Sequence, residues 1–231
     1  LDLNFIHEKI ELRSLWKLLP PKITPVGNFI FKNKFEHDFN IVISCGRKSV
    51  IPSIYLKKKL KNKIINIHIQ DPKVSLENFD YIVAPEHDGL IGDNVLTSKG
   101  AIHYLTNDQL NENENYLRDK IDKIDSKKKI VTLVVGGPTK HYNYKSKIWD
   151  EIFKKIESTF LNGDYQLVVV PSMRTPQEII DKANYFFHPC WDNEQIIIPD
   201  VDKKAYLSAL KISDHILVTC DSISMISEAA I

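Results

Sequence analysis

The stretch Ile-Val-Thr-Leu-Val-Val-Gly-Gly-Pro-Thr, from Ile130 to Thr139, decides the fold of this chain. Its first six residues are mostly apolar and β-branched, which is typical of a strand buried on both faces of a parallel sheet. The two glycines let the backbone turn sharply and approach a ligand closely. Ligands of open α/β sheets lie beyond the carboxyl ends of the strands. We therefore expect a phosphate or nucleotide site at Gly136, Gly137, Pro138 and Thr139.

The same order of strand, turn and helix recurs along the chain. Asn40 to Ser44 and Tyr165 to Val170 are expected to be buried strands, and helices are expected over Lys145 to Phe160 and, capped by Thr175, to about Phe187. Strands alternating with helices predict parallel sheets with right-handed crossovers. The alternation in Asn4 to Leu12 predicts one more strand.

The polar stretch Asp125 to Lys129 is expected to link two halves. The fold class that follows is α/β, with two Rossmann-like domains at residues 1–128 and 129–231. Leu1 is not a start methionine, and Ile231 falls within the second turn of an expected helix. We therefore expect a fragment that is cut at both ends.

Composition excludes several classes of protein. The chain has 231 residues, 43% hydrophobic and 26% charged, with a formal net charge of +1. A net charge this small produces no overall electrostatic attraction to nucleic acid or to an anionic membrane. Three widely spaced cysteines indicate a reducing compartment, and Cys45 and Cys220 are expected to be buried at strand ends. Without a signal pattern or a long apolar run, the expected location is the cytoplasm.

The first half offers several polar strand ends. The turn Gly46-Arg47-Lys48-Ser49 suits an anionic or polyhydroxyl ligand, although its two cations could equally face water. His87 beside Asp88 is a candidate general base, with a surface histidine as the alternative interpretation. The remaining acceptor-side candidates are Gln70, Asp71 and His103.

In the second half, Arg174 precedes a predicted helix start and is a candidate phosphate clamp. A later helix is expected to begin near Ser222, where hydroxyls and unpaired amides together could bind an anion. Glu228 could then hold a ribose. The alternative is that Asp221 or Ser222 only caps the helix and Glu228 faces solvent. The candidates of this helix are Ser222, Ser224, Met225 and Glu228.

Seven short motifs, in order along nearly the whole chain, resemble the mitochondrial-fission Elm family, which has plant and many bacterial members. They are Ser44-Cys45-Gly46-Arg47-Lys48-Ser49, Gln70-Asp71-Pro72-Lys73, Pro85-Glu86-His87-Asp88, Gly100-Ala101-Ile102-His103, Val135-Gly136-Gly137-Pro138, Arg174-Thr175-Pro176 and the segment from Asp221 to Ala230. Plant members of this family are implicated in bringing a dynamin-like GTPase to the mitochondrial surface. The resemblance therefore implies a non-catalytic adaptor as one function.

The layout is more distantly similar to GT-B glycosyltransferases, in which two Rossmann-like domains face each other across a cleft. The matching positions are Gly136, Gly137, Ser222, Ser224 and Glu228. This similarity implies a metal-independent transferase without a cofactor, whose substrates are a nucleotide-diphosphate sugar and an unknown acceptor. His87 would accept the proton. Nucleic acid is not an expected partner, and a peripheral membrane or protein partner is left open.

Bacterial family members are often labelled nucleoside-diphosphate-sugar epimerases. Tyr55 and Lys59 have the tyrosine-lysine spacing of the short-chain dehydrogenase type of epimerase. However, no glycine triple follows an early strand, as that fold requires. We interpret the spacing as accidental.

Overall fold

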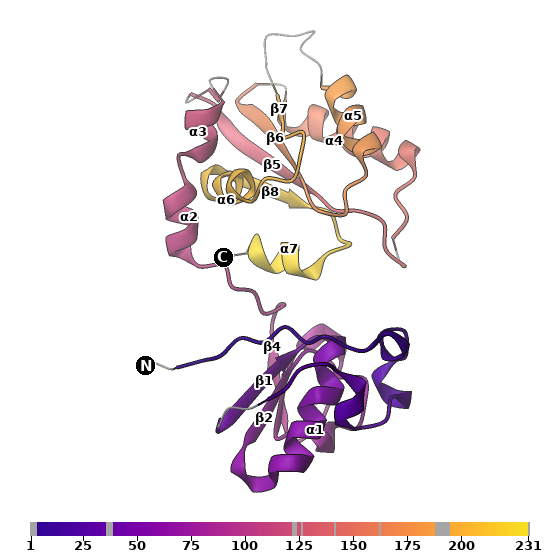
Figure 1. Cartoon of the computed structure of the whole chain (residues 1–231). Helices are drawn as coiled ribbons and strands as arrows, with labels where there is room; N and C mark the ends of the chain where they lie inside the picture. Colours follow the sequence, from indigo (N-terminus) through magenta and orange to yellow (C-terminus); the bar gives the residue numbers. More distant parts are fainter. Residues whose placement is uncertain are drawn as a thin grey trace. The chain divides into compact units, whose positions relative to one another are not determined.

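The structure, a computed structural model, describes residues 4–35, 39–121, 124–125, 127–140, 142–161, 163–187 and 195–230. It is an α/β fold with parallel sheets, as the sequence predicts. The chain divides into two compact units, Leu1–Ala101 (unit 1) and Ile102–Ile231 (unit 2). Each contains its own four-stranded sheet (Figure 1).

Unit 1 is built on a parallel sheet in the order β1-β2-β3-β4. Its elements are β1 (Ile41–Cys45), α1 (Val50–Leu60), β2 (Ile65–Ile69), β3 (Tyr81–Pro85) and β4 (Val95–Ser98). Helix α1 lies along β1 and β2 (Figure 1) and packs Val50, Ile51 and Ile54 onto the sheet. The core of unit 1 therefore lies on one face of its sheet.

The strand expected at Asn4 to Leu12 does not form. The described residues of this segment contain only an isolated antiparallel bridge between Leu12 and Phe31. Both side chains are nevertheless buried in the core of unit 1. The alternation of apolar residues thus reflected burial of Leu12 rather than a full strand, because pairing between the described residues here and the segment around Phe31 is limited to two backbone hydrogen bonds, from Arg13 to Ile30 and from Lys32 to Glu11.

Unit 2 is built on a parallel sheet in the order β7-β6-β5-β8. Its strands are β5 (Lys129–Val135), β6 (Tyr165–Pro171), β7 (Ile196–Ile197) and β8 (His215–Val218). Its helices are α2 (Asn107–Asn113), α3 (Tyr116–Lys120), α4 (Ser146–Phe160), α5 (Gln177–Phe186), α6 (Lys203–Ile212) and α7 (Ile223–Glu228).

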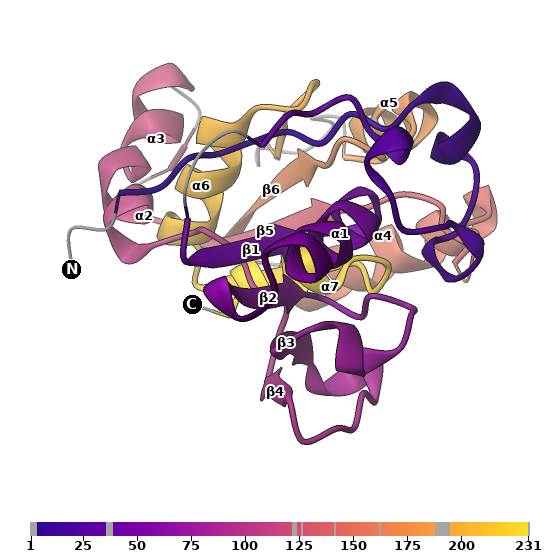
Figure 2. The ribbon, with the colours of Figure 1, turned by 60° about the horizontal axis from the view of Figure 1, so that its bottom comes forward.

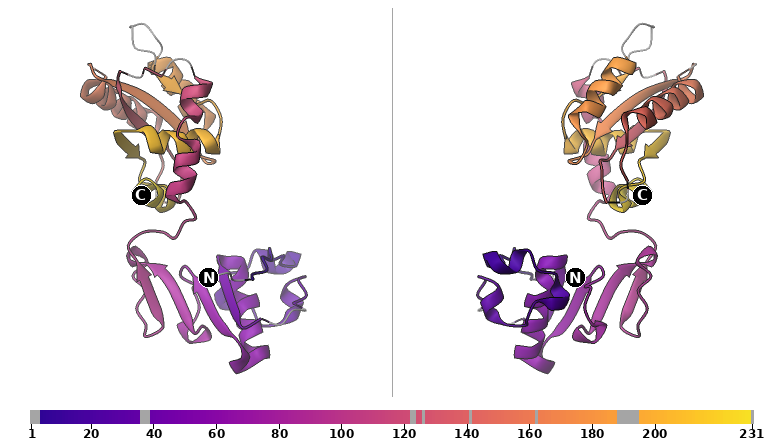
Figure 3. Two further views of the ribbon diagram at one scale, coloured as in Figure 1. Left: turned by 90° about the vertical axis from the view of Figure 1, so that its left-hand side faces the viewer. Right: turned by 90° about the vertical axis from the view of Figure 1, so that its right-hand side faces the viewer.

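Strand β5 is central, and helices cover both of its faces. On one face, Val131, Leu133 and Val135 pack against Trp149 and Phe153 of α4 and against α5. On the other, Ile130 packs against α6. Figure 3 shows α4 and α6 on opposite sides of these strands. This layering explains the nearly continuous apolar run, since a strand covered on both faces has no exposed positions.

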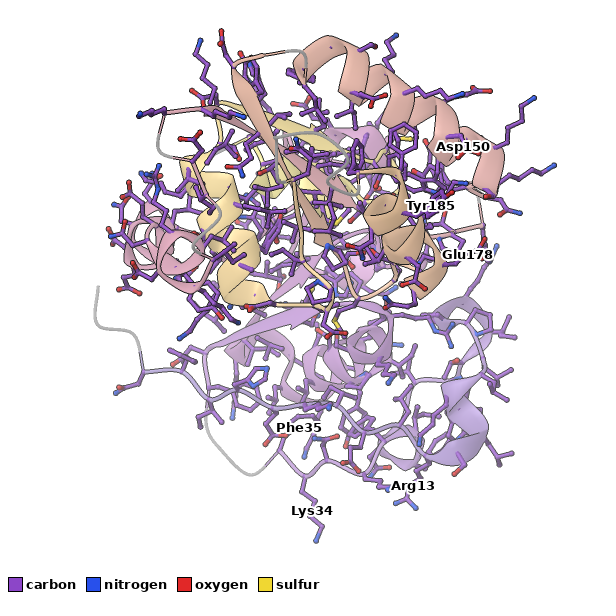
Figure 4. All side chains as sticks on the ribbon, turned by 90° about the horizontal axis from the view of Figure 1, so that it is seen from above. Arg13, Lys34, Phe35, Asp150, Glu178 and Tyr185 are labelled. Atoms are coloured by element: carbon purple, nitrogen blue, oxygen red, sulfur yellow. The ribbon has the colours of Figure 1, made fainter. Side chains whose placement is uncertain are left out.

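An ion pair joins the outer sides of α4 and α5. Lys182 Nζ of α5 lies 2.7 Å from Asp150 Oδ1 of α4. Figure 4 shows Asp150 together with Glu178 and Tyr185, both of α5, on the outer surface of these helices. Tyr185 is 87% exposed and is therefore not part of the aromatic core that α4 and α5 form with the sheet.

The boundary between the units differs from the expected one at 128/129. Residues 102–128 belong with unit 2, because α2 and α3 pack against α6 (Figure 2). The hydroxyl of Ser208 on α6 donates to the Glu114 carbonyl oxygen (2.9 Å) and accepts from the Leu117 amide (3.1 Å). The described part of the polar stretch, Asp125 and residues 127–128, therefore lies within unit 2, and Lys129 is the first residue of β5.

Candidate functional site

Gly136 and Gly137 are buried where β5 ends. A Cβ on Gly136 would overlap the carboxylate of Asp221, and a Cβ on Gly137 would overlap the backbone of Arg174. Neither glycine has a positive φ. The sequence therefore needs glycine here for close approach of three strand ends, rather than for an unusual backbone conformation.

Asp221, which follows β8, joins these strand ends. Its side chain is fully buried. Oδ2 accepts from the Gly137 amide (3.1 Å) and from Arg174 Nη2 (3.0 Å). Oδ1 accepts from the Thr219 hydroxyl (2.6 Å) and from the Tyr144 hydroxyl (3.1 Å). Buried carboxylates require such partners, and this one has donors from four segments.

The sequence singled out Arg174, indicated Asp221 only as a helix cap, and pointed to neither Thr219 nor Tyr144 as a candidate. Asp221 had one signal, because it is an acidic residue three positions after β8, and a carboxylate that becomes buried needs partners. Tyr144 had none. Burial, followed by its contacts with Cys220 and Asp221, raises the pKa of Tyr144 above its ordinary value, so its hydroxyl stays a donor.

The loop after β6 carries Arg174. The helix that follows it is not capped by Thr175, although the sequence predicts that cap. Helix α5 begins at Gln177 with Pro176 as its N-cap, and no side chain caps it. The Thr175 hydroxyl instead donates to the Val135 carbonyl oxygen (2.6 Å) and accepts from the Ser172 amide (2.8 Å). Thr175 thus fastens the Arg174 loop to β5, and the Arg174 side chain remains 46% exposed.

Pro138 is exposed, and Thr139 starts the turn that follows. The Thr139 amide donates to the Tyr142 carbonyl oxygen (2.8 Å), and its hydroxyl accepts from the Tyr142 amide (3.1 Å). The ring of Tyr142 stacks on Tyr144. The turn thereby leads directly to the tyrosine that donates to Asp221.

The candidates on α7 do not all lie with the glycines. Ser222 is the N-cap and accepts from the Met225 amide (3.5 Å), as the capping interpretation predicts. Met225 packs against the cluster of Val134, Leu207 and Leu210. Glu228 neither caps α7 nor stands alone in solvent, because its Oε2 accepts from the Tyr206 hydroxyl (2.8 Å).

Ser224 of α7 is exposed. The structure therefore brings Arg174 to Gly136 and Gly137, while Ser224 and Glu228 lie further along a six-residue helix.

In unit 1, the turn after β1 is held by its own side chains. Gly46 has φ +78°, a conformation that favours glycine. The Ser49 hydroxyl donates to the Cys45 carbonyl oxygen (2.8 Å), and Arg47 Nη2 donates to the Lys17 carbonyl oxygen (2.6 Å). Lys48 is exposed. Arg47 therefore does not only face water, because it bonds to the backbone of Lys17, thirty residues earlier. Neither of the two sequence interpretations included that contact.

The loop after β2 is strained and charged. Gln70 (φ +80°) and Lys73 (φ +57°) both have positive φ, which is uncommon outside glycine. Asp71 lies between them and accepts from the Lys73 amide (2.8 Å). Burial alone would raise the pKa of Asp71. The hydrogen bonds from the ammonium and the amide of Lys73 nevertheless lower it. Strain of this kind clusters at functional sites.

His87 and Asp88 form a contact of 3.7 Å between Nε2 and Oδ1 at the end of β3, with side chains 42% and 30% exposed. His103 belongs to unit 2 rather than to the acceptor-side half. Its Nδ1 is buried and has no hydrogen-bond partner among the described residues.

Cys45 and Cys220 are exposed free thiols, not the buried strand-end thiols that the sequence suggested. Both follow apolar runs, but each lies at the carboxyl end of its strand, in the turn before the next helix begins.

The model of the family described as Mitochondrial fission ELM1 matches residues 1–231. The chain belongs to this family. The Mitochondrial fission protein ELM1 of Arabidopsis thaliana is 23% identical over 218 residues, covering 82% of this chain and 48% of that protein. An uncharacterized protein of Rickettsia prowazekii (strain Madrid E) is 25% identical over 228 residues, covering 83% and 62%. The ELM1-family chain thus spans less than two thirds of both relatives.

Two solved structures are similar to this ELM1-family chain. The UDP-GlcNAc 2-epimerase from Methanocaldococcus jannaschii has a TM-score of 0.48 and 15% identity, covering 82% of this chain and 58% of that one. The S. aureus MnaA-UDP co-structure has a TM-score of 0.42 and 15% identity, covering 79% and 53%. Among the described residues, no helix has the length and apolar character needed to cross a membrane.

Proposed function

We propose that unit 2 binds the diphosphate of a nucleotide sugar where β5 and β6 end, and that the protein is a metal-independent glycosyltransferase. The observation that supports this proposal is the way in which Arg174 is held. Its guanidinium is fixed by a buried carboxylate beside two buried glycines, and its side chain is still 46% exposed. A planar fork held in this way suits the bidentate recognition of a phosphate.

The glycines contribute by being small. Without Cβ atoms, Gly136 and Gly137 let Asp221 and the Arg174 loop approach the end of β5 closely, which places the Arg174 guanidinium there. The N-terminus of α7 contributes little, since a helix of six residues has only a weak dipole. Glu228 would have to share its carboxylate between Tyr206 and a ribose.

The acceptor side of the proposal belongs to unit 1. His87 would take the proton, oriented by Asp88, and the strained loop of Gln70 and Asp71 would hold the acceptor. Two free cysteines among the described residues, Cys45 and Cys220, support a reducing compartment, and we propose the cytoplasm.

Replacing Arg174 with glutamine is expected to weaken the binding of uridine diphosphate about ten- to thirtyfold, because a charge-assisted pair of hydrogen bonds is lost. Isothermal titration calorimetry measures this directly, after a thermal-shift panel of nucleotides has selected the tightest ligand. Lys182→Gln, which removes a cation on the outer side of α5, is the matched control. No shift with any uridine, cytidine or guanosine diphosphate compound would contradict the proposal.

A second candidate function, an adaptor that recruits a dynamin-like GTPase, is favoured by a surface on unit 1. Five apolar side chains of the sheet are 45–65% exposed on the face away from α1, and we call them the open sheet face: Ile41, Ile43, Ile65, Tyr81 and Leu96. Parallel sheets are normally covered on both faces. An open apolar face marks an interaction site.

The size of this face indicates its partner. Four strands spaced about 4.8 Å apart, each of about five residues rising 3.3 Å, give roughly 300 Å² of flat surface. A stable interface between two globular proteins buries about 800 Å² per partner, whereas one helix about 10 Å wide covers such a face. The adaptor function therefore predicts an amphipathic helix of the partner.

Ile43→Lys is expected to weaken the binding of a purified dynamin-like GTPase at least tenfold, because it puts a charge at the most exposed residue of the open sheet face. The fold should tolerate it, since Ile43 is 65% exposed. Lys58→Glu is the control, because it changes the charge of an exposed residue on α1, away from the open sheet face. Biolayer interferometry measures the binding of both variants, and only Ile43→Lys should lose affinity. A wild-type protein that does not bind the GTPase excludes this candidate function.

A further inference from the structure

The role of Asp221 goes beyond that of a helix cap. Its two carboxylate oxygens accept from a backbone amide, two hydroxyls and a guanidinium, all within 3.1 Å. The N-cap of α7 is the next residue, Ser222, so helix capping does not occupy this carboxylate. The donors come from the ends of β5, β6 and β8 and from the segment before α4.

The geometry around Arg174 shows what this carboxylate controls. Arg174 Nη2 reaches inward to Asp221, whose side chain has no solvent exposure. The Arg174 loop itself is anchored through Thr175 to the Val135 carbonyl oxygen. With the loop and one end of the fork both held, the guanidinium has one orientation at the surface. Rigid placement of this kind raises affinity by reducing the entropy lost on binding.

We propose that Asp221 is the positioning residue of the anion site, acting on a diphosphate through Arg174. This inference rests on the proposed function for the identity of the ligand, but the orientation of Arg174 is independent of it. A negative charge so close to an anion site would by itself repel the ligand. With Asp221 present, the gain in affinity from fixing the Arg174 guanidinium outweighs that repulsion.

The two effects predict opposite signs. Asp221→Asn keeps the shape and removes the charge. If repulsion dominated, the variant would bind pyrophosphate and uridine diphosphate more tightly. We expect about tenfold weaker binding of both probes by calorimetry on the full chain. We also expect no further loss when Asp221→Asn is added to Arg174→Gln, because the effect runs through the arginine.

Tyr144→Phe separates positioning from general stability. It removes one donor to Asp221 and leaves the contact with Arg174 intact. The melting temperature should fall, while both dissociation constants stay within twofold of the wild type. A loss equal to that of Asp221→Asn would make Asp221 a purely structural residue and overturn the proposal.

Rotation of the Arg174 guanidinium, measured by NMR of labelled arginine side chains, tests the proposal without a ligand. We expect slow rotation in the wild type and fast rotation in Asp221→Asn. Fast rotation in the wild type overturns the proposal, even if Asp221→Asn does not fold. Slow rotation in a wild type that binds neither probe would support the positioning role and reject the proposed function, so the two failures are distinguishable.

Discussion

Gly137→Ala is expected to lower the free energy of unfolding of unit 2 by about 2–4 kcal/mol, as overpacking at a rigid site does. The added Cβ would overlap the carbonyl oxygen and carbon of Arg174. These are backbone atoms, so no side-chain rotation relieves the overlap. The loop after β6 would have to move away from β5, which breaks the hydrogen bond from the Thr175 hydroxyl to the Val135 carbonyl oxygen (2.6 Å). Urea unfolding followed by Trp149 fluorescence measures the change.

Gly163→Ala is the matched control. A Cβ there meets nothing within 4 Å, and the residue lies in a turn before β6. Its effect should stay within about 0.5 kcal/mol, or stabilise slightly by restricting the unfolded chain. Equal stability of the two variants would show that the strand ends do not approach each other as closely as the glycines imply.

The sequence predicted the central layer of unit 2 well, for a physical reason. A strand covered on both faces leaves an uninterrupted apolar run, and β5 was identified from that run. Helix α4 was likewise identified within one residue, because its apolar positions face one side. In both elements a local pattern directly reports burial.

What the sequence could not supply were contacts between distant segments. The boundary between the units depends on Ser208 bonding to α2 and α3, about ninety residues earlier in the chain. The site depends on Asp221, three of whose four donors come from segments that only the folded sheet brings together. No local pattern of residues encodes such pairings, so Arg174 was found by its position before a helix and its orienting partner was not.

Acid is expected to destabilise unit 1 through His68. The ring is 1% exposed, stacks against Phe79, and its Nδ1 lies 2.8 Å from the Ser44 hydroxyl. Burial lowers the pKa of His68 from 6.5 to about 4, although the nearby Asp71 carboxylate raises it in part. Between these two values the unfolded chain binds a proton that the folded unit does not bind. Stability should therefore be constant above about pH 7 and fall by about 3 kcal/mol as the pH drops to about 4.

Hydrogen exchange of peptides from β1 and β2, in urea at pH 7 and pH 5, reads this effect in unit 1 alone. Staying at pH 5 or above limits the contribution of Asp71 and Asp80, whose lowered pKa values act mainly below that range. His68→Gln should remove most of the pH dependence. Ser44→Ala should retain it, because burial is the main cause of the shift and the hydrogen bond is not. A slope that disappears in Ser44→Ala would instead assign the acid sensitivity to the buried hydrogen bond.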